Sequence, residues 1–159
     1  MSETILVTGG TGGIGAAICR RLAGPGTTIA FTYRSRADAA RTLAAELEER
    51  GARVHAAAVD LLDADATAAF VADVPRDGVR TLVHAAGPHV PMVHLSRVEP
   101  DRFRAALDAE VASFFNVVAA ALPRLRASTG SVVAVTTAAT SRFPVRDGLY
   151  AGPKAAVES

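Results

Sequence analysis

A short apolar strand that runs straight into a glycine-rich turn constrains this chain more than any other feature. Residues 4–8 read Thr-Ile-Leu-Val-Thr, and residues 9–15 read Gly-Gly-Thr-Gly-Gly-Ile-Gly. A helical stripe follows, in which apolar side chains recur every four residues from Ile14 to Leu22. Glycine permits a sharp turn and removes the Cβ that would keep a phosphate from a helix N-terminus. The pattern predicts a strand, a turn and a helix that can receive a pyrophosphate.

Strand and helix patterns alternate along the rest of the chain. The expected strands cover residues 4–8, 27–33, 53–59, 81–85 and 131–136, and the expected helices cover 13–22, 37–50, 64–73, 100–126 and 149 onward. Such alternation predicts an α/β fold with a parallel sheet and right-handed crossovers. We expect a doubly wound Rossmann-type sheet of five strands in the order 3-2-1-4-5, with flanking helices, as one domain over residues 1–159. Its ligand should lie outside the carboxyl ends of the strands.

Composition narrows the classes of partner and the cellular location. The 17 basic and 16 acidic residues leave a net charge of +1, so neither nucleic acid nor an anionic membrane is expected as a partner. The single cysteine, Cys19, cannot form an internal disulfide, which fits a reducing compartment. The chain enters a strand almost at once, and no apolar run is expected to span a bilayer. We therefore expect no signal peptide, and the predicted location is cytoplasmic.

Tyr150 and Lys154 lie one helical turn apart near the end of the chain. This spacing places a phenol and an ammonium group on one helix face. A phenol titrates near 10, so it is a poor acid–base catalyst at neutral pH unless a nearby cation favours the phenolate. Lys154 can supply that cation. Pro153 is expected in the first turn of this helix, where proline is tolerated.

Together and in this order, the two motifs resemble those of the short-chain dehydrogenase/reductase family, and within it the 3-oxoacyl-carrier-protein reductases. The resemblance runs from Thr4 to the end of the chain. It implies an oxidoreductase that interconverts a ketone and a secondary alcohol. The chain stops five residues after Lys154, before the family's usual substrate-binding segment. The C-terminal part of the family fold is therefore expected to be absent, and it stays open whether residue 159 is the natural end.

The resemblance assigns cofactor-binding residues to the strand ends. The turn fits the pattern TGxxxGxG, although Gly12 also allows TGxxGxxG, the spacing of the extended sugar-epimerase branch. After the second strand, a carboxylate would bind the 2′-OH of NAD, whereas Arg34 can bind the 2′-phosphate of NADP. The predicted cofactor is therefore NADP(H); alternatively, Arg34 and Arg36 form a solvated helix entrance. The predicted cofactor-binding residues are Gly9, Thr11, Gly13, Ile14, Gly15, Arg34, Asp60, Leu61, Ala85, Ala86, Gly87, Tyr150 and Lys154.

Two of the strand ends carry residues with alternative interpretations. The resemblance places Asp60 and the next amide against adenine, but Asp60 could instead cap the following helix. His84-Ala-Ala-Gly stands where the family often has Asn-Asn-Ala-Gly, and we interpret His84 as a packing residue. His84, His89 and His94 recur every five residues. That spacing is not typical of ligands, so no metal is expected.

The resemblance also assigns catalytic roles, with two departures from the family pattern. Tyr150 is the expected general acid, and Lys154 is its electrostatic partner and holds the nicotinamide ribose. Thr137 stands thirteen residues before the tyrosine, where the family has serine. Glu110 aligns with an asparagine that supports a proton-relay water. A carboxylate there could still bind water, or it could pair with Lys154 and weaken its effect on Tyr150.

Non-catalytic alternatives remain beside the enzyme hypothesis. The chain could be an NADP-binding module that has lost turnover, or a subunit that pairs with an intact homologue. Tyr150 and Lys154 favour an enzyme, whereas Glu110, Thr137 and the early end favour the alternatives. The expected partners are a small-molecule carbonyl or alcohol substrate, free or bound to a carrier protein, and further copies of the chain. Relatives associate through the long helix and the last helix, so a homo-oligomer is expected.

Overall fold

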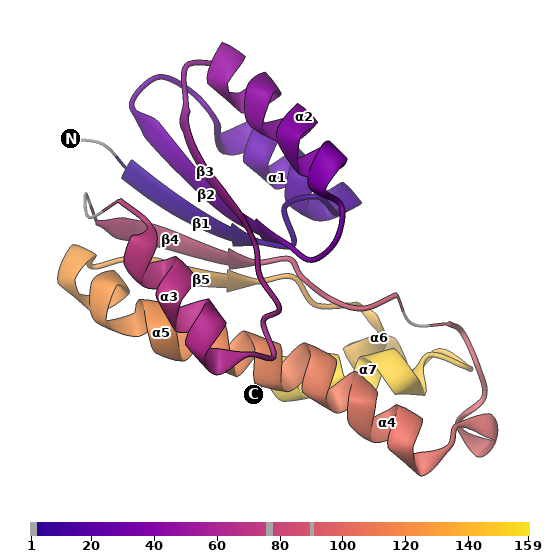
Figure 1. Cartoon of the computed structure of the whole chain (residues 1–159). Coiled ribbons are helices and arrows are strands. Elements are labelled where there is room, and N and C mark those ends of the chain that lie inside the picture. The colour runs from indigo at the N-terminus through magenta and orange to yellow at the C-terminus, as the bar shows by residue number, and fades with distance from the viewer. Residues whose placement is uncertain (1–2, 76–77, 90) are drawn as a thin grey trace.

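The computed structural model describes residues 3–75, 78–89 and 91–159. Within them, five parallel strands form one sheet in the order β3-β2-β1-β4-β5, which confirms the predicted order (Figure 1). The strands are β1 (Glu3–Thr8), β2 (Thr27–Tyr33), β3 (Arg53–Ala58), β4 (Val79–His84) and β5 (Ser131–Ala134). The helices are α1 (Gly13–Leu22), α2 (Ala37–Glu49), α3 (Ala64–Asp73), α4 (Pro100–Leu107), α5 (Ser113–Ser128), α6 (Ala139–Arg142) and α7 (Gly148–Glu158). A 3-10 turn, η1 (Leu95–Arg97), and a π-helical turn, η2 (Asp108–Ala112), complete the described elements.

The central strands are buried on both faces because helices cover each side of the sheet. Figure 1 shows α1 and α2 on one face and α3 and α5 on the other. Successive residues of a strand point to opposite faces. Leu6 and Ala30 therefore pack against α3 and α5, whereas Val7 and Phe31 pack against α1 and α2. This sandwich fixes the carboxyl ends of the strands, where the expected site residues lie.

One long helix, built from α4, η2 and α5, crosses the lower face of the sheet in Figure 1. The sequence pattern predicted a helix over residues 100–126; the observed helix reaches Ser128 and contains the π turn. By length and composition alone, Pro100–Ser128 could cross a membrane, so the expectation that no apolar run is long enough was wrong. The helix contacts α3, β4 and α7 here. The core helix of a soluble protein passes the same test, so this signal is weak.

Arg124 fastens the long helix to the end of α3. Its guanidinium donates to the carbonyl oxygens of Val71 and Val74 at 2.5 and 2.9 Å, and to that of Pro75 at 2.5 Å. These carbonyls belong to the last turn of α3 and the residues after it, where helical partners are missing. A cation at a helix C-terminus also complements the helix dipole. Arg124 therefore stabilises the packing of α5 on α3.

At the β4–β5 edge of the sheet, the strands begin and end at other residues than the sequence predicted. β4 begins at Val79, two residues before the predicted start, and β5 ends at Ala134, two residues before the predicted end. The short elements η1 and α6 were not predicted. β5 is the edge strand, and its Val132 and Val133 are 41% and 49% exposed. Both faces of β5 are thus less covered than those of the inner strands.

Candidate functional site

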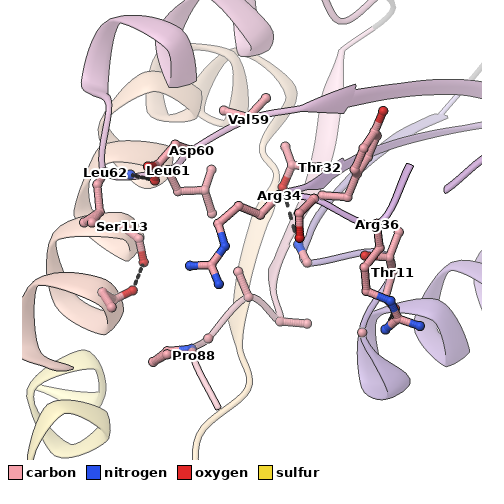
Figure 2. A pocket seen from close by; sticks show the side chains of 18 residues that line it. Thr11, Thr32, Arg34, Arg36, Val59, Asp60, Leu61, Leu62, Pro88 and Ser113 are labelled. Carbon is pink, nitrogen blue, oxygen red and sulfur yellow. Dashed lines mark hydrogen bonds between the residues drawn. The ribbon is translucent and has the colours of Figure 1, made fainter. Parts of the chain in front are cut away.

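An open cleft of about 250 Å³ lies at the carboxyl ends of the strands (Figure 2). The segments that follow β1, β2, β3 and β4 form most of its wall, and the long helix contributes Ala109 and Ser113. The cleft brings together eight of the predicted cofactor-binding residues. They are Gly9, Thr11, Arg34, Asp60, Leu61, Ala85, Ala86 and Gly87. Parallel strands end at the same edge of the sheet, which is why residues so far apart in sequence meet here.

Gly9 shows why the first turn needs glycine. Its φ is +69°, a left-handed conformation that favours glycine. A Cβ on Gly9 would come within 2.7 Å of the Ala86 Cα atom, so the segments after β1 and β4 could not approach as they do. The Gly12 amide closes the turn by donating to the Gly9 carbonyl at 2.9 Å. The backbone therefore forms this part of the cleft wall directly.

The second half of the glycine motif lies outside the cleft lining. Gly15 is buried in α1, and a Cβ there would come within 2.2 Å of the Gly9 carbonyl oxygen. Gly15 thus lets the helix pack against the turn. Gly13 has open space around its Cβ position, and Ile14 is 58% exposed. These three predicted residues are placed at the start of α1, and of them Gly15 alone has a steric need for glycine.

The two arginines after β2 have different surroundings. Figure 2 shows the Arg34 side chain reaching into the middle of the cleft. Arg34 is exposed and makes no hydrogen bond or ion pair with any residue in the described ranges. Arg36 instead donates to the Thr11 carbonyl oxygen at 2.8 Å and so braces the glycine turn. Arg34 is the cation that is free to meet an anionic ligand.

The loop after β3 is held in place by side chains on both sides. Asp60 Oδ1 accepts from the Leu62 amide at 3.0 Å, whereas Asp63 caps α3 by accepting from the Ala66 amide at 2.9 Å. The alternative in which Asp60 caps the helix is therefore wrong. Asn116 of α5 donates from Nδ2 to the Leu61 carbonyl oxygen at 2.9 Å. We did not predict this anchor, because the sequence gives no sign that α5 reaches the loop.

His84 ends β4 and is fully buried, as its interpretation as a packing residue requires. Its Nδ1 lies 3.0 Å from Thr8 Oγ1, and that hydroxyl accepts from the Ala86 amide at 3.2 Å. Burial, and then the positive charge of Lys154, lowers the pKa of His84 to about 4. The imidazole is therefore neutral at pH 7. Within the described ranges, no three His, Cys, Asp or Glu side chains gather as a metal site would need.

Lys154 lies in the interior beside Glu110. Its Nζ atom is 2.6 Å from Glu110 Oε2 and donates to the Val135 carbonyl oxygen at 3.0 Å. The Lys154 and Glu110 side chains are 2% and 0% exposed. Of the two alternatives for Glu110, pairing with Lys154 is the one that the structure shows. An ion pair this deep is weak evidence for stability, because desolvating both charges offsets much of their attraction.

Tyr150 precedes Lys154 on α7, and the Lys154 Nζ atom lies 5.4 Å from the centre of the Tyr150 ring. Thr137 lies between β5 and α6, where its hydroxyl accepts from the Ala139 amide at 3.2 Å. None of the three is among the described residues that line the cleft. The sequence predicted Pro153 in the first turn of the last helix. α7 begins at Gly148, so Pro153 falls in its second turn instead. The catalytic candidates thus lie beside the cleft and do not form its wall.

The sequence matches the family described as short chain dehydrogenase over residues 3–159. It is 35% identical over 159 residues to a serine 3-dehydrogenase of Agrobacterium fabrum, a match that covers 98% of this chain and 61% of that protein. Its fold resembles that of a short chain dehydrogenase from Burkholderia cenocepacia in complex with NADP, with a TM-score of 0.88, 34% identity, and coverage of 98% and 64%. An NAD+-bound xylitol dehydrogenase gives a TM-score of 0.90 with 27% identity and coverage of 98% and 60%.

The chain therefore belongs to the short-chain dehydrogenase/reductase family, a family of oxidoreductases with the Rossmann-type sheet described above. One of the two similar structures holds NADP and the other NAD+. The likeness supports a nicotinamide cofactor without choosing between these two. The chain spans less than two thirds of the length of each of these three relatives.

Proposed function

We propose that the chain is the nucleotide-binding part of an NADP(H)-dependent oxidoreductase that interconverts a ketone and a secondary alcohol. We further propose a cytoplasmic location and a small-molecule substrate, either free or bound to a carrier protein. The observation that carries the proposal is the Arg34 guanidinium, which has no partner among the described residues and lies in a cleft that is partly walled by the backbone of Gly9 and Ala86. The Arg34 guanidinium would select a phosphate, and the absence of a side chain at Gly9 would give that phosphate room.

The residues of the cleft fit such a cofactor. Gly9 and Ala86 approach so closely that no side chain fills the space between the turn and β4. Backbone amides in the turn before α1 suit a pyrophosphate, because the helix N-terminus carries partial positive charge. Arg34 would hold the 2′-phosphate with charge-assisted hydrogen bonds. Asp60 and the Leu61 amide would hold the adenine, on a loop that Asn116 keeps in place.

When bound, the reduced nicotinamide supplies a hydride to the carbonyl carbon. Tyr150 would give the phenolic proton to the carbonyl oxygen, so that the product is an alcohol and the phenol becomes a phenolate. Lys154 would stabilise that phenolate with its positive charge. Thr137 would donate a hydrogen bond to the substrate oxygen. In the reverse direction the phenolate accepts the proton of the alcohol.

A specific observation favours a second candidate function, a nucleotide-binding module without turnover. Lys154 is engaged by Glu110 in the interior, and neither Tyr150 nor Thr137 lines the cleft within the described residues. A chain in this state would bind nucleotide through Arg34 and the glycine turn and would not reduce a carbonyl. The two candidates share the cleft and differ in the use of α7.

An NADPH absorbance assay with a panel of ketones separates the two functions. If the chain is an oxidoreductase, it should oxidise NADPH with a ketone, and Tyr150→Phe should abolish this turnover. Calorimetry should then show that Tyr150→Phe binds NADPH nearly as tightly as the wild type. The module reading predicts binding without turnover in both proteins. Turnover that survives in Tyr150→Phe would refute the proposed proton donor, and a chain that binds neither NADPH nor NADH would refute both readings.

A further inference from the structure

Lys154 has its ammonium group in the protein interior, although the proposed function needs it at the cleft. Its Nζ atom forms an ion pair with Glu110 Oε2 at 2.6 Å and donates a hydrogen bond to the Val135 carbonyl oxygen at 3.0 Å. The side chain is 2% exposed. In this arrangement the ammonium is shielded from solvent and from any ligand in the cleft.

Glu110 reaches Lys154 from the π turn η2, which packs against α7. Among the residues the structure describes, neither carboxylate oxygen has a hydrogen-bond partner; Oε2 forms the ion pair with Lys154, which leaves the second oxygen, Oε1, unpaired. This oxygen lies directly behind the cleft wall at Gly87, where a Cβ would come within 2.6 Å of it. The carboxylate thus has the cleft wall on one side and the Lys154 ammonium on the other.

We propose that Glu110 is a positioning residue that acts as a latch: it holds Lys154 in the interior, and nucleotide must draw the ammonium out of this pair. The inference rests on the proposed function, because that function assigns Lys154 to the nucleotide and to Tyr150. It adds a linkage between cofactor binding and the availability of the lysine. Lys154 reaches the cleft only in the unlatched state.

The charges decide which state is favoured. In the latched state both buried charges are paired, whereas release leaves the Glu110 carboxylate buried without a cation, which is costly. Apparent nucleotide affinity falls in proportion to the fraction of molecules in the competent state. Glu110→Gln reverses the balance. It removes the anion and leaves the Lys154 ammonium as an unpaired buried charge, which favours its release toward water and the cleft.

The sequence provides a clean probe, because Lys154 is its only lysine. We would react the folded chain with N-hydroxysuccinimidyl acetate and follow acetylation of Lys154 by mass spectrometry, with the denatured chain as reference. Glu110→Gln should be acetylated at least tenfold faster than the wild type. Asp108→Asn removes an exposed carboxylate from the same π turn and should react at the wild-type rate.

Loss of stability could also expose the lysine, so a second control is needed. Arg124→Ala removes the hydrogen bonds from Arg124 to the end of α3 and lies away from Lys154, and its melting temperature can be compared with that of Glu110→Gln. The latch predicts fast acetylation in Glu110→Gln alone. Equal acetylation rates in Glu110→Gln and the wild type, or equal acceleration in the two destabilised variants, would overturn it.

Nucleotide titration then tests the linkage. NADPH should bind at least tenfold more tightly to Glu110→Gln than to the wild type, and Asp108→Asn should bind like the wild type. Unchanged or weaker binding by Glu110→Gln would overturn the latch and make Glu110 a support for the lysine. If no variant binds nucleotide, the proposed function fails, and the acetylation rates still decide whether Glu110 holds Lys154.

Discussion

Gly15→Ala tests whether the glycine motif is constrained by packing in the way the structure indicates. The added methyl group would lie 2.2 Å from the Gly9 carbonyl oxygen and 2.8 Å from its carbon. That carbonyl is held by the Gly12 amide, so the turn cannot simply move aside. Overpacking of this kind costs about 1–3 kcal/mol. At roughly 2–4 °C per kcal/mol for a domain of this size, the melting temperature should fall by roughly 2–12 °C.

Gly13→Ala is the matched control from the same motif. Apart from its chain neighbours and the backbone of its own helix, no described atom lies within 4 Å of the added methyl group, and the residue begins α1 with a negative φ. Alanine there should be neutral or stabilise the fold by up to about 1 kcal/mol, because it lowers the entropy of the unfolded chain. Calorimetric melting and NADP+ titration of both variants form the assay. A Gly15→Ala protein that melts and binds like Gly13→Ala would refute the packing argument.

Three further predictions follow from particular side chains. Arg34→Asp should abolish or reverse a preference for NADP(H) over NAD(H) in calorimetry, because each charge-assisted bond to the 2′-phosphate contributes about 1.5–3 kcal/mol; unchanged selectivity would remove Arg34 from the site. Burial lowers the pKa of His84 to about 4 in the folded chain, whereas the pKa of the unfolded histidine is near 6.5. Stability should therefore be complete above pH 6.5 and fall as the pH drops from about 6.5 to 4, by about 3 kcal/mol. Urea midpoints for the wild type and His84→Gln would show this, and parallel pH profiles would contradict it. Finally, Phe115 is 68% exposed on α5. We therefore expect either that the chain forms a dimer or larger assembly, which Phe115→Asp weakens, or that it is one piece of a longer protein. A fully active monomer in light scattering would contradict both alternatives.

The strands could be located from local patterns, and their order and most of the cleft residues followed from the doubly wound topology and the family resemblance. β-branched runs and glycine breaks identify the strands, and parallel topology then brings Arg34, Asp60 and Ala85 to one edge of the sheet. The boundaries of β4 and β5 were less accurate. Residues at strand ends take their conformation from a neighbouring strand, which sequence alone does not supply.

The environment of the catalytic candidates could not be predicted to the same depth. The sequence left two roles open for Glu110, because the choice depends on whether α7 packs against the π turn. No residue pattern distinguishes this turn from an ordinary helical turn. The hydroxyl of Thr137 meets a nearby amide, and Pro153 lies in the second turn of α7. Both outcomes follow from where α6 and α7 begin, which depends on tertiary contacts.

The π turn sets the rotational phase of the long helix. Glu110 lies within the π turn and contacts Lys154 of α7, whereas Asn116 lies after the π turn and contacts the loop after β3. A deletion of one residue from Asp108–Ala112 would rotate everything downstream by about 100° relative to α4. Either the carboxylate would leave the lysine or the amide would leave the Leu61 carbonyl. A change in the length of this helix would therefore separate the contact of Glu110 with α7 from the contact of Asn116 with the loop after β3.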